Sequence, residues 1–176
     1  MKSIKFIICA FLVGCSQNVT NVTGVCKSCK PYKVRGSCYT PQLYYEYYEY
    51  GKASWYGPGF HGKQKATGEK YNQNALTAAH RTLPLPTVVV VRNIKNGKSI
   101  KLVVDDRGPY TYAGRIIDLS VAAAKKIGTY ETGLGNVLVC SDVKESKALS
   151  NFLYKYGTRG LTYRQVYDRY ISGKCK

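Results

Sequence analysis

Short apolar runs separated by turn signals constrain this fold more than any other feature of the sequence. Six such runs occur at residues 53–56, 76–79, 87–92, 99–104, 115–119 and 133–140. The run at 87–92 contains four consecutive valines, and a strand without polar alternation is covered on both faces. Asn96 and Gly97, between two of the runs, are a strong signal for a two-residue hairpin. A small closed β-barrel satisfies these requirements.

One strand end carries the residues best suited to chemistry. The run at 99–104 leads into two adjacent carboxylates, Asp105 and Asp106, and then into a turn of Arg107, Gly108 and Pro109. Successive strand side chains point to opposite faces, so we expect Asp105 to face away from Asp106. A stiff strand holds a carboxylate still and a glycine turn leaves room for a ligand. Carbohydrate-cleaving sites are often built in this way.

The clearest helical signal follows the strand at 115–119. Ser120 is a suitable N-cap for a helix at residues 121–127, and Gly128 provides its stop. The sequence therefore predicts an all-β domain at residues 51–141 with one or two short helices. Residues 142–176 are expected to form a basic C-terminal extension.

The first residues have the features of a secretion signal. Two lysines precede an apolar run at residues 6–13, which is too short to span a bilayer because spanning takes roughly 20 residues. The run ends in Leu-Val-Gly before Cys15, which resembles the bacterial lipoprotein box and predicts lipidation of Cys15. An ordinary cleaved signal with a chance cysteine is the alternative. We expect a signal peptide at residues 1–14 and an anchor in the outer membrane, facing the periplasm.

The charge balance bears on the partners of the chain. Lys and Arg number 27 against 10 Asp and Glu, which gives a formal net charge of +17 and predicts adhesion to polyanions. A protein in the cell envelope meets anionic peptidoglycan and lipid, so nucleic acid is not an expected partner. The sequence does not indicate an oligomeric state.

Cysteine usage fits an oxidising compartment. Outside the signal and the lipidation site, the cysteines are Cys26, Cys29, Cys38, Cys140 and Cys175. In the periplasm these are expected to pair, and the odd count leaves one over or pairs it between chains. The Cys26-Lys-Ser-Cys29 segment resembles half of a zinc or redox site, but no second such segment follows. A structural disulfide is favoured, with its connectivity open.

Residues 15–50 are expected to be a tether and pre-domain segment, because aliphatic residues are scarce before Leu43. A tyrosine-rich run occupies residues 43–50. Tyrosines at this density either stack on sugar rings through their broad apolar faces or form a partly packed edge segment.

Several ordered motifs resemble the rare lipoprotein A (RlpA) family. They read GKASWYGPGFHGKQKATGEKYNQNALTAAHRTLP, VVVVRNIKNGKS, VVDDRGPY and GRIIDLSVAAAKKIG, and KPYKVRGSCYTP at residues 30–41 resembles the pre-domain segment of that family. The resemblance implies a six-stranded double-psi β-barrel, a fold shared with expansins and some endoglucanases. It also implies a lytic transglycosylase that cuts peptidoglycan glycan strands between N-acetylmuramic acid and N-acetylglucosamine, leaving 1,6-anhydro ends.

The resemblance carries three functional residues onto this chain. Asp106 falls on the acid of the family's DRGP block and is the expected catalytic acid. Glu69, in ATGEKY, is expected to position substrate or stabilise the positive charge that develops on the sugar. His80, in TAAHRTLP, is expected to hydrogen-bond and orient the acid. The alternatives are a turn-forming or Arg107-paired aspartate, a solvated loop glutamate and a buried structural histidine.

Other residues are expected to contact the substrate. Trp55, Tyr56 and Phe60 are predicted to form an aromatic surface for sugar rings, with core packing accounting for at least one of them, Tyr56 or Phe60. Arg107 is a further candidate for substrate binding. Asp118 is as suited to a structural role as to substrate binding.

No metal or cofactor is expected, because His61 and His80 lack a third ligand at convincing spacing. Two departures from the family pattern are visible. The residues after Cys140 do not resemble the repeat domain that binds denuded glycan at division sites, and Lys65 stands where members usually carry a small hydroxyl residue. The sequence therefore leaves two hypotheses, a lipid-anchored lytic transglycosylase and a non-catalytic wall-binding lipoprotein.

Overall fold

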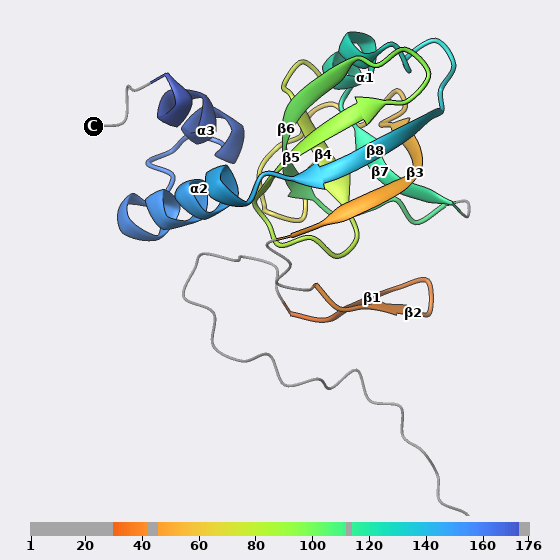
Figure 1. Ribbon diagram of the computed structural model, residues 1–176. Helices are drawn as coiled ribbons and strands as arrows, with labels where there is room; N and C mark the ends of the chain where they lie inside the picture. The colour runs from red at the N-terminus through yellow and green to blue at the C-terminus, as the bar shows by residue number, and fades with distance from the viewer. Residues whose placement is uncertain (1–29, 42–45, 112–113, 173–176) are drawn as a thin grey trace, which may run out of the picture.

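Six strands of the computed structural model close into a barrel (Figure 1), with neighbours in the order β3-β7-β4-β6-β5-β8. They are β3 (Tyr48–Trp55), β4 (Thr77–His80), β5 (Thr87–Asn93), β6 (Ser99–Asp106), β7 (Arg115–Leu119) and β8 (Gly135–Ser141). The pairs β3–β7 and β4–β6 are parallel and the other four pairs are antiparallel. This mixed closed barrel confirms the predicted fold class.

The structure describes residues 30–41, 46–111 and 114–172. The expected signal peptide at 1–14, the lipidation site Cys15, and Cys26, Cys29 and Cys175 lie outside the described residues. β3 begins three residues before the expected domain start at residue 51. The predicted hairpin after β5 is present, but residues 94–98 form a five-residue connection rather than a two-residue turn.

The valine run is buried on both faces for two different reasons. Val89 and Val91 point into the barrel core, where they meet side chains from every other strand. Val88 points outward and is covered by Leu149 and Tyr163 from the C-terminal segment. The closed barrel alone therefore does not explain the absence of polar alternation, because a barrel covers only its inner face.

Helix α1 (Val121–Ile127) forms where the sequence predicted it. The Ser120 side chain accepts a hydrogen bond from the Ala123 N–H, and Gly128 ends the helix in the left-handed conformation at φ 75°. Glycine adopts this conformation without steric cost, so the helix stops there. Ala123, Ala124 and Ile127 face the barrel core.

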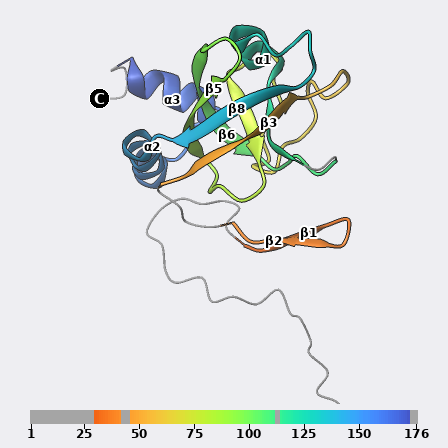
Figure 2. The same ribbon diagram turned by 45° about the vertical axis from the view of Figure 1, so that its right-hand side comes forward.

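The described part of the expected basic C-terminal extension contains two helices. Helices α2 (Val143–Tyr156) and α3 (Tyr163–Ile171) pack beside the outer faces of β5 and β6 (Figure 2). The described residues thus contain three helices, against an expected one or two. The buried positions recur with helical spacing: Ser146, Leu149 and Leu153 in α2, and Tyr163, Val166 and Tyr167 in α3.

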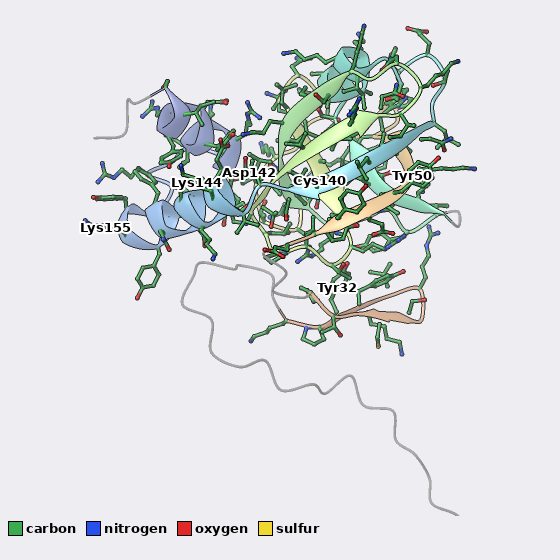
Figure 3. The ribbon with its side chains drawn as sticks, in the orientation of Figure 1. Tyr32, Tyr50, Cys140, Asp142, Lys144 and Lys155 are labelled. Atoms are coloured by element: carbon green, nitrogen blue, oxygen red, sulfur yellow. The ribbon has the colours of Figure 1, made fainter. Side chains whose placement is uncertain are left out.

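A separate hairpin of β1 (Tyr32–Val34) and β2 (Ser37–Tyr39) lies below the barrel in Figure 1. The Tyr32 side chain lies between this hairpin and the barrel (Figure 3), and its hydroxyl donates to the Arg81 carbonyl at 2.7 Å. Tyr110 closes the contact, with ring centroids 6.3 Å from Tyr32 and 5.5 Å from Tyr39. The hairpin thereby borders the turn that follows Asp106.

The tyrosine-rich run enters the barrel through β3. The first residues of β3, Tyr48–Gly51, pair with β8 alone, since pairing with β7 begins at Lys52. Tyr48 and Tyr50 are exposed, whereas Tyr47 packs against the core and its ring meets that of His80 edge to face. This part of the run is therefore a partly packed edge segment. Stacking of the exposed Tyr48 and Tyr50 rings on sugars stays a prediction.

Candidate active site

Asp106, the last residue of β6, is held by three hydrogen bonds. Its Oδ1 accepts from the backbone N–H groups of Ala66 at 2.7 Å and Arg107 at 2.8 Å. Its Oδ2 accepts from the Tyr56 hydroxyl at 2.6 Å. The side chain is half-buried at the barrel end. The carboxyl group is therefore fixed in one orientation without being sealed from a ligand.

Three aromatic rings lie beside this carboxyl group and are called the aromatic stack. Tyr56 stacks on Tyr71 with ring centroids 4.4 Å apart, and Phe60 meets Tyr56 edge to face at 5.7 Å. Phe60 is the exposed member, with 45% of its surface accessible. The stack thus joins a fixed carboxyl group to an open aromatic face, which is the surface that sugar rings favour.

Trp55 does not belong to the aromatic stack. Its ring packs against Tyr130 at 4.6 Å, and its indole N–H donates to the Tyr130 carbonyl at 3.1 Å. Alternation along β3 turns Trp55 away from the side that Tyr56 occupies. Core packing was expected for Tyr56 or Phe60, but Trp55 is the one of the three that packs on the core cluster.

The turn after Asp106 depends on Gly108. Its φ of 143° lies in a region that side-chain-bearing residues rarely adopt. Arg107 is anchored inward, since its guanidinium donates to the carbonyls of His80, at 3.1 Å, and Leu83. Its guanidinium carbon also lies 5.7 Å from the centre of the Tyr32 ring. These contacts give Arg107 a part in fixing the turn.

Asp118 lies on the same side of the barrel wall as Asp106. Ala79 of β4 pairs with Asp106 on one side and with Asp118 on the other, and the charge of Asp106 is among the causes that raise the pKa of Asp118. Asp118 accepts hydrogen bonds from Ser54 and from Arg115 at 3.4 Å. Burial raises the pKa of Asp118, with Ser54 and Arg115 opposing the shift.

Glu69 is committed to other protein groups. Its Oε1 accepts from the backbone N–H of Tyr163, the first residue of α3, at 2.7 Å. Its Oε2 accepts from Lys65 Nζ at 2.9 Å. Both oxygens of the predicted substrate-positioning glutamate therefore have protein partners, and neither contacts Asp106.

Asp105, the residue before Asp106, is buried and paired with a lysine. It is 1% exposed and accepts a hydrogen bond from Lys65 through Oδ2, while its Oδ1 has no hydrogen-bond partner. Burial raises its pKa to about 7, although Lys65 acts in the opposite direction. Lys65, Glu69 and Asp105 form a buried charge cluster, whereas Asp106 is bound by Ala66, Arg107 and Tyr56, so the two adjacent aspartates share no hydrogen-bond partner.

His80 does not orient Asp106 directly, which corrects that prediction. Its Nδ1 accepts from the backbone N–H groups of Thr82 at 3.2 Å and Leu83 at 3.0 Å, which leaves the proton on Nε2. Nε2 lies 2.9 Å from the Tyr47 hydroxyl. Burial, together with the charges of Arg81 and Arg107, lowers the pKa of His80 to about 3. A buried, neutral histidine that binds two backbone groups has a structural role.

The structure therefore divides the predicted site residues into two groups. Tyr56, Phe60 and Asp118 gather around Asp106, with Arg107 shaping the turn. Glu69, His80 and Trp55 each bind other parts of the fold. Tyr71 and the Ala66 N–H contribute to the site and were missed, because no sequence pattern identifies a stacking ring or a backbone donor.

The described residues contain no disulfide, no metal-ligand cluster and no membrane-spanning helix. Cys38 and Cys140 are both free, so the expected disulfides do not form at these two positions, which lie on separate elements. Among residues 30–41, 46–111 and 114–172, no three His, Cys, Asp or Glu side chains are arranged to hold a metal ion. Over the same ranges, no helix has the length and apolar character needed to cross a membrane.

The barrel matches a known protein family. A family model described as lytic transglycolase matches residues 48–139, just over half of the chain and all but the last two residues of the barrel. The chain belongs to the lytic transglycolase family. The resemblance that the motifs predicted is thereby confirmed, and the matched region includes Asp106, the aromatic stack and the charge cluster.

Two relatives within the lytic transglycolase family are named RlpA. A probable endolytic peptidoglycan transglycosylase RlpA of Synechocystis sp. is 61% identical over 87 residues, which are 49% of this chain and 27% of that protein. An endolytic peptidoglycan transglycosylase RlpA of Neisseria meningitidis is 44% identical over 137 residues, 73% of this chain and 57% of that protein. This chain thus spans about a quarter and just over half of their lengths.

Solved structures resemble the barrel less closely. The Streptomyces papain inhibitor aligns with 54% of this chain and 94% of its own length, at a TM-score of 0.43 and 23% identity. An expansin of Clavibacter michiganensis, in complex with cellohexaose, aligns with 54% of this chain and 50% of its own, at a TM-score of 0.43 and 16% identity.

Proposed function

We propose that this protein is a lytic transglycosylase that cleaves peptidoglycan glycan strands between N-acetylmuramic acid and N-acetylglucosamine, with Asp106 as its acid. The observation that carries the proposal is the position of Asp106, a carboxyl group fixed by three hydrogen bonds next to an exposed aromatic face. Membership in the lytic transglycolase family and relatives named as peptidoglycan transglycosylases support the substrate class.

The proposed reaction needs one enzyme acid and no water. Asp106 gives its proton to the leaving glycosidic oxygen as the bond from that oxygen to C1 breaks. The C6 hydroxyl of the same muramic acid unit then bonds to C1, and its proton returns to the Asp106 carboxylate. Because the nucleophile belongs to the substrate, its effective concentration is high and a second catalytic carboxylate is not required.

Tyr56 suits this cycle because its hydroxyl both donates and accepts. It donates to Asp106 Oδ2 when the carboxyl group is ionised. When Oδ2 carries the proton, the hydroxyl can rotate and accept from it instead. The two backbone donors on Oδ1 cannot reverse in this way, so they favour protonation at Oδ2, the oxygen beside the aromatic stack.

The proposal includes a place in the cell envelope. The signal at residues 1–14 and lipidation of Cys15 would anchor the chain in the outer membrane facing the periplasm, where glycan strands are within reach. Residues 15–50 would then serve as tether and pre-domain segment. Removal of the signal takes away Lys2 and Lys5, and the remaining formal net charge of 17 − 2 = +15 supports adhesion to an anionic wall polymer. Retention of radiolabelled palmitate, lost in Cys15→Ala, tests the anchor.

Product analysis tests the activity. Purified sacculi and denuded glycan strands are digested with wild-type protein, and released fragments are examined by mass spectrometry for 1,6-anhydro ends. We expect such ends from wild-type protein and at least 100-fold less from Asp106→Asn, because general acid catalysis contributes about 10²–10⁴-fold. Glu131→Gln, at an exposed glutamate in the turn before β8, is the matched control and keeps full activity. Wild-type protein that releases no anhydro product from either substrate overturns the proposal.

A second function, non-catalytic wall binding, is favoured by one observation. Glu69 and His80, two of the three residues implied by the family resemblance, are bound to other protein groups and do not contact Asp106. A sacculus pull-down distinguishes the two functions. Binding that survives Asp106→Asn, without any soluble product from wild-type protein, identifies a binding protein rather than an enzyme.

A further inference from the structure

A continuous set of contacts joins the C-terminal helix α3 to the loop that holds Asp106. The N–H of Tyr163 in α3 donates to Glu69, and Lys65 Nζ donates to both Glu69 and Asp105. The next residue along the loop, Ala66, donates its N–H to Asp106. Lys65 therefore lies between the helix and the residue that orients the acid.

Backbone hydrogen bonds also close the loop at residues 65–69 into a turn. The Lys65 N–H donates to the Glu69 carbonyl at 2.8 Å, and the Gly68 N–H donates to the Lys65 carbonyl at 2.9 Å. The side-chain ion pair between Lys65 and Glu69 closes the same turn a second time. The position of Ala66 is thus set by how firmly Lys65 is held.

Burial strengthens the electrostatic interactions within the charge cluster. The side chains of Lys65, Glu69 and Asp105 are 4%, 14% and 1% exposed, so water screens their interactions little. Burial alone would lower the pKa of Lys65, but Asp105 and Glu69 more than offset this and the pKa is raised. Lys65 is therefore a cation with two fixed carboxylate partners, one of which is tied to α3.

We infer that Lys65 is a positioning residue that uses the docked helix α3 to hold the Ala66 N–H against Asp106. The C-terminal helices are then part of the active-site scaffold of this chain rather than an appendage. The inference deepens the proposed transglycosylase function and rests on it for its kinetic part. Its structural part concerns the Ala66 N–H and is measured without substrate.

The test uses the full chain with Lys65→Met, which keeps the length of the side chain and removes its charge. Lys70→Met is the matched control, because Lys70 is exposed on the same loop. Hydrogen exchange at the Ala66 amide, followed by NMR, is expected to quicken at least tenfold in Lys65→Met and to stay unchanged in Lys70→Met. On denuded glycan, kcat is expected to fall about tenfold in Lys65→Met with KM within twofold of wild type.

A second variant guards against loss of folding. Lys65→Met leaves two buried carboxylates without their cation, whereas Lys65→Met/Asp105→Asn removes one of those charges and is expected to fold. Faster Ala66 exchange and lower kcat in this double variant support the inference. Unchanged Ala66 exchange in either folded variant overturns it.

Two outcomes separate this inference from the proposed function. A rise in kcat in Lys65→Met overturns the inference, since it means that the α3 contact restrains the site by occupying Glu69. Absence of product from wild-type protein overturns the proposed function alone, and the Ala66 exchange rates then decide by themselves whether Lys65 and α3 position Asp106.

Discussion

Asp105 and Asp106 are adjacent in the sequence and occupy opposite kinds of environment. Asp106 sits at the barrel end beside the aromatic stack, with three hydrogen-bond donors on its carboxyl group. Asp105 is 1% exposed, lies beside a buried lysine with one oxygen unpartnered, and is among the residues that line a small pocket between the barrel and α3. Two adjacent residues of one strand therefore differ in burial and in partners, one half-buried among neutral donors and the other buried in a charge cluster.

The comparison teaches that a carboxylate's surroundings decide its role. The Asp106 region offers an open aromatic face, and its donors are two backbone N–H groups and one hydroxyl. The Asp105 region offers a cation and a helix N-terminus, which commit the charges of Lys65, Glu69 and Asp105 to one another. The predictions below test this division, beginning with the largest expected effect.

Exchanging each aspartate for asparagine separates the two regions most strongly. Asp106→Asn is expected to lower turnover about 10²–10⁴-fold with little change in stability, because the amide oxygen still accepts from Ala66 and Arg107. Asp105→Asn is expected to keep turnover within about tenfold of wild type, as expected of a group that acts only through Lys65. Anhydro-product release and urea unfolding are measured for both. Equal loss of turnover in the two variants would break the division.

His80→Ala tests whether the histidine belongs to the structural region. Two backbone N–H groups, those of Thr82 and Leu83, lose their acceptor, and each costs about 1–3 kcal/mol when left unpaired. We expect a loss of about 2–5 kcal/mol in the free energy of unfolding, measured with urea. The exposed His61→Ala is the control and should change this value by less than about 1 kcal/mol. Similar losses in both variants would contradict the structural role.

Tyr56→Phe sharpens the description of the Asp106 region. The substitution removes the hydroxyl that donates to Asp106 and leaves the ring stacked on Tyr71. We expect turnover to fall about tenfold, which corresponds to one hydrogen bond to a charged group. Tyr71→Phe, which keeps the same stack, is expected to fall less than twofold. Both kcat values are measured on denuded glycan, and a larger loss in Tyr71→Phe than in Tyr56→Phe would contradict the role given to the Tyr56 hydroxyl.

The pH dependence of stability distinguishes the buried groups. Because burial raises the pKa of Asp105 to about 7, the folded chain binds more protons than the unfolded chain between about pH 4 and 7. The contribution of Asp105 to the free energy of unfolding therefore falls as pH rises through this window. His80 acts in the opposite sense, since its pKa of about 3 means that its contribution is lost as pH falls below about 6.5.

These opposing slopes are separated by a variant. Relative to Asp105→Asn, the wild-type free energy of unfolding should decrease from pH 4.5 to pH 7.5, as followed by urea unfolding at several pH values. Asp105→Asn itself should then gain stability over this range, because the His80 contribution is no longer opposed. Parallel curves for wild type and variant would show that Asp105 does not titrate in this window.

Phe60→Ala has the smallest expected effect. Phe60 is the exposed ring of the aromatic stack, and we expect its contact with a sugar to be on the scale of an aromatic pair, about 0.5–1.5 kcal/mol. We expect KM on denuded glycan to rise about threefold with kcat unchanged. Ile94→Ala, an equally exposed apolar residue on the β5–β6 connection, is the control. A change in kcat rather than KM would assign Phe60 to the chemistry instead of to binding.

Local sequence signals predicted those parts of the fold that are decided locally. Ser120 and Gly128 delimit α1 because capping and left-handed backbone depend on neighbouring residues alone. The six β runs were identified correctly for the same reason, since each run carries its own apolar pattern. The six-stranded barrel was implied by the family resemblance, because closure is not a property of neighbouring residues. The helical spacing of Leu149 with Leu153, and of Val166 with Tyr163, is also present in the sequence, although residues 142–176 were expected only to form a basic extension.

The candidate site was predicted only in part. Asp106, Tyr56 and Phe60 do come together, yet Glu69 and His80 have other partners. Their contacts run to Tyr163, 94 residues along the chain from Glu69, and to Tyr47, 33 residues from His80. No pattern of neighbouring residues encodes such pairings, because they arise only when the barrel closes and α3 docks.

The amino-acid order alone determined the strands, the first helix and the turn after Asp106, since period-two alternation and capping are properties of adjacent residues. Only the tertiary structure decided which aspartate is half-buried and which is buried beside a lysine. That outcome depends on where Lys65, Tyr56 and α3 come to lie, and burial depends on groups distant in the chain. The chemistry of a carboxylate therefore follows from its packing, not from its neighbours in sequence.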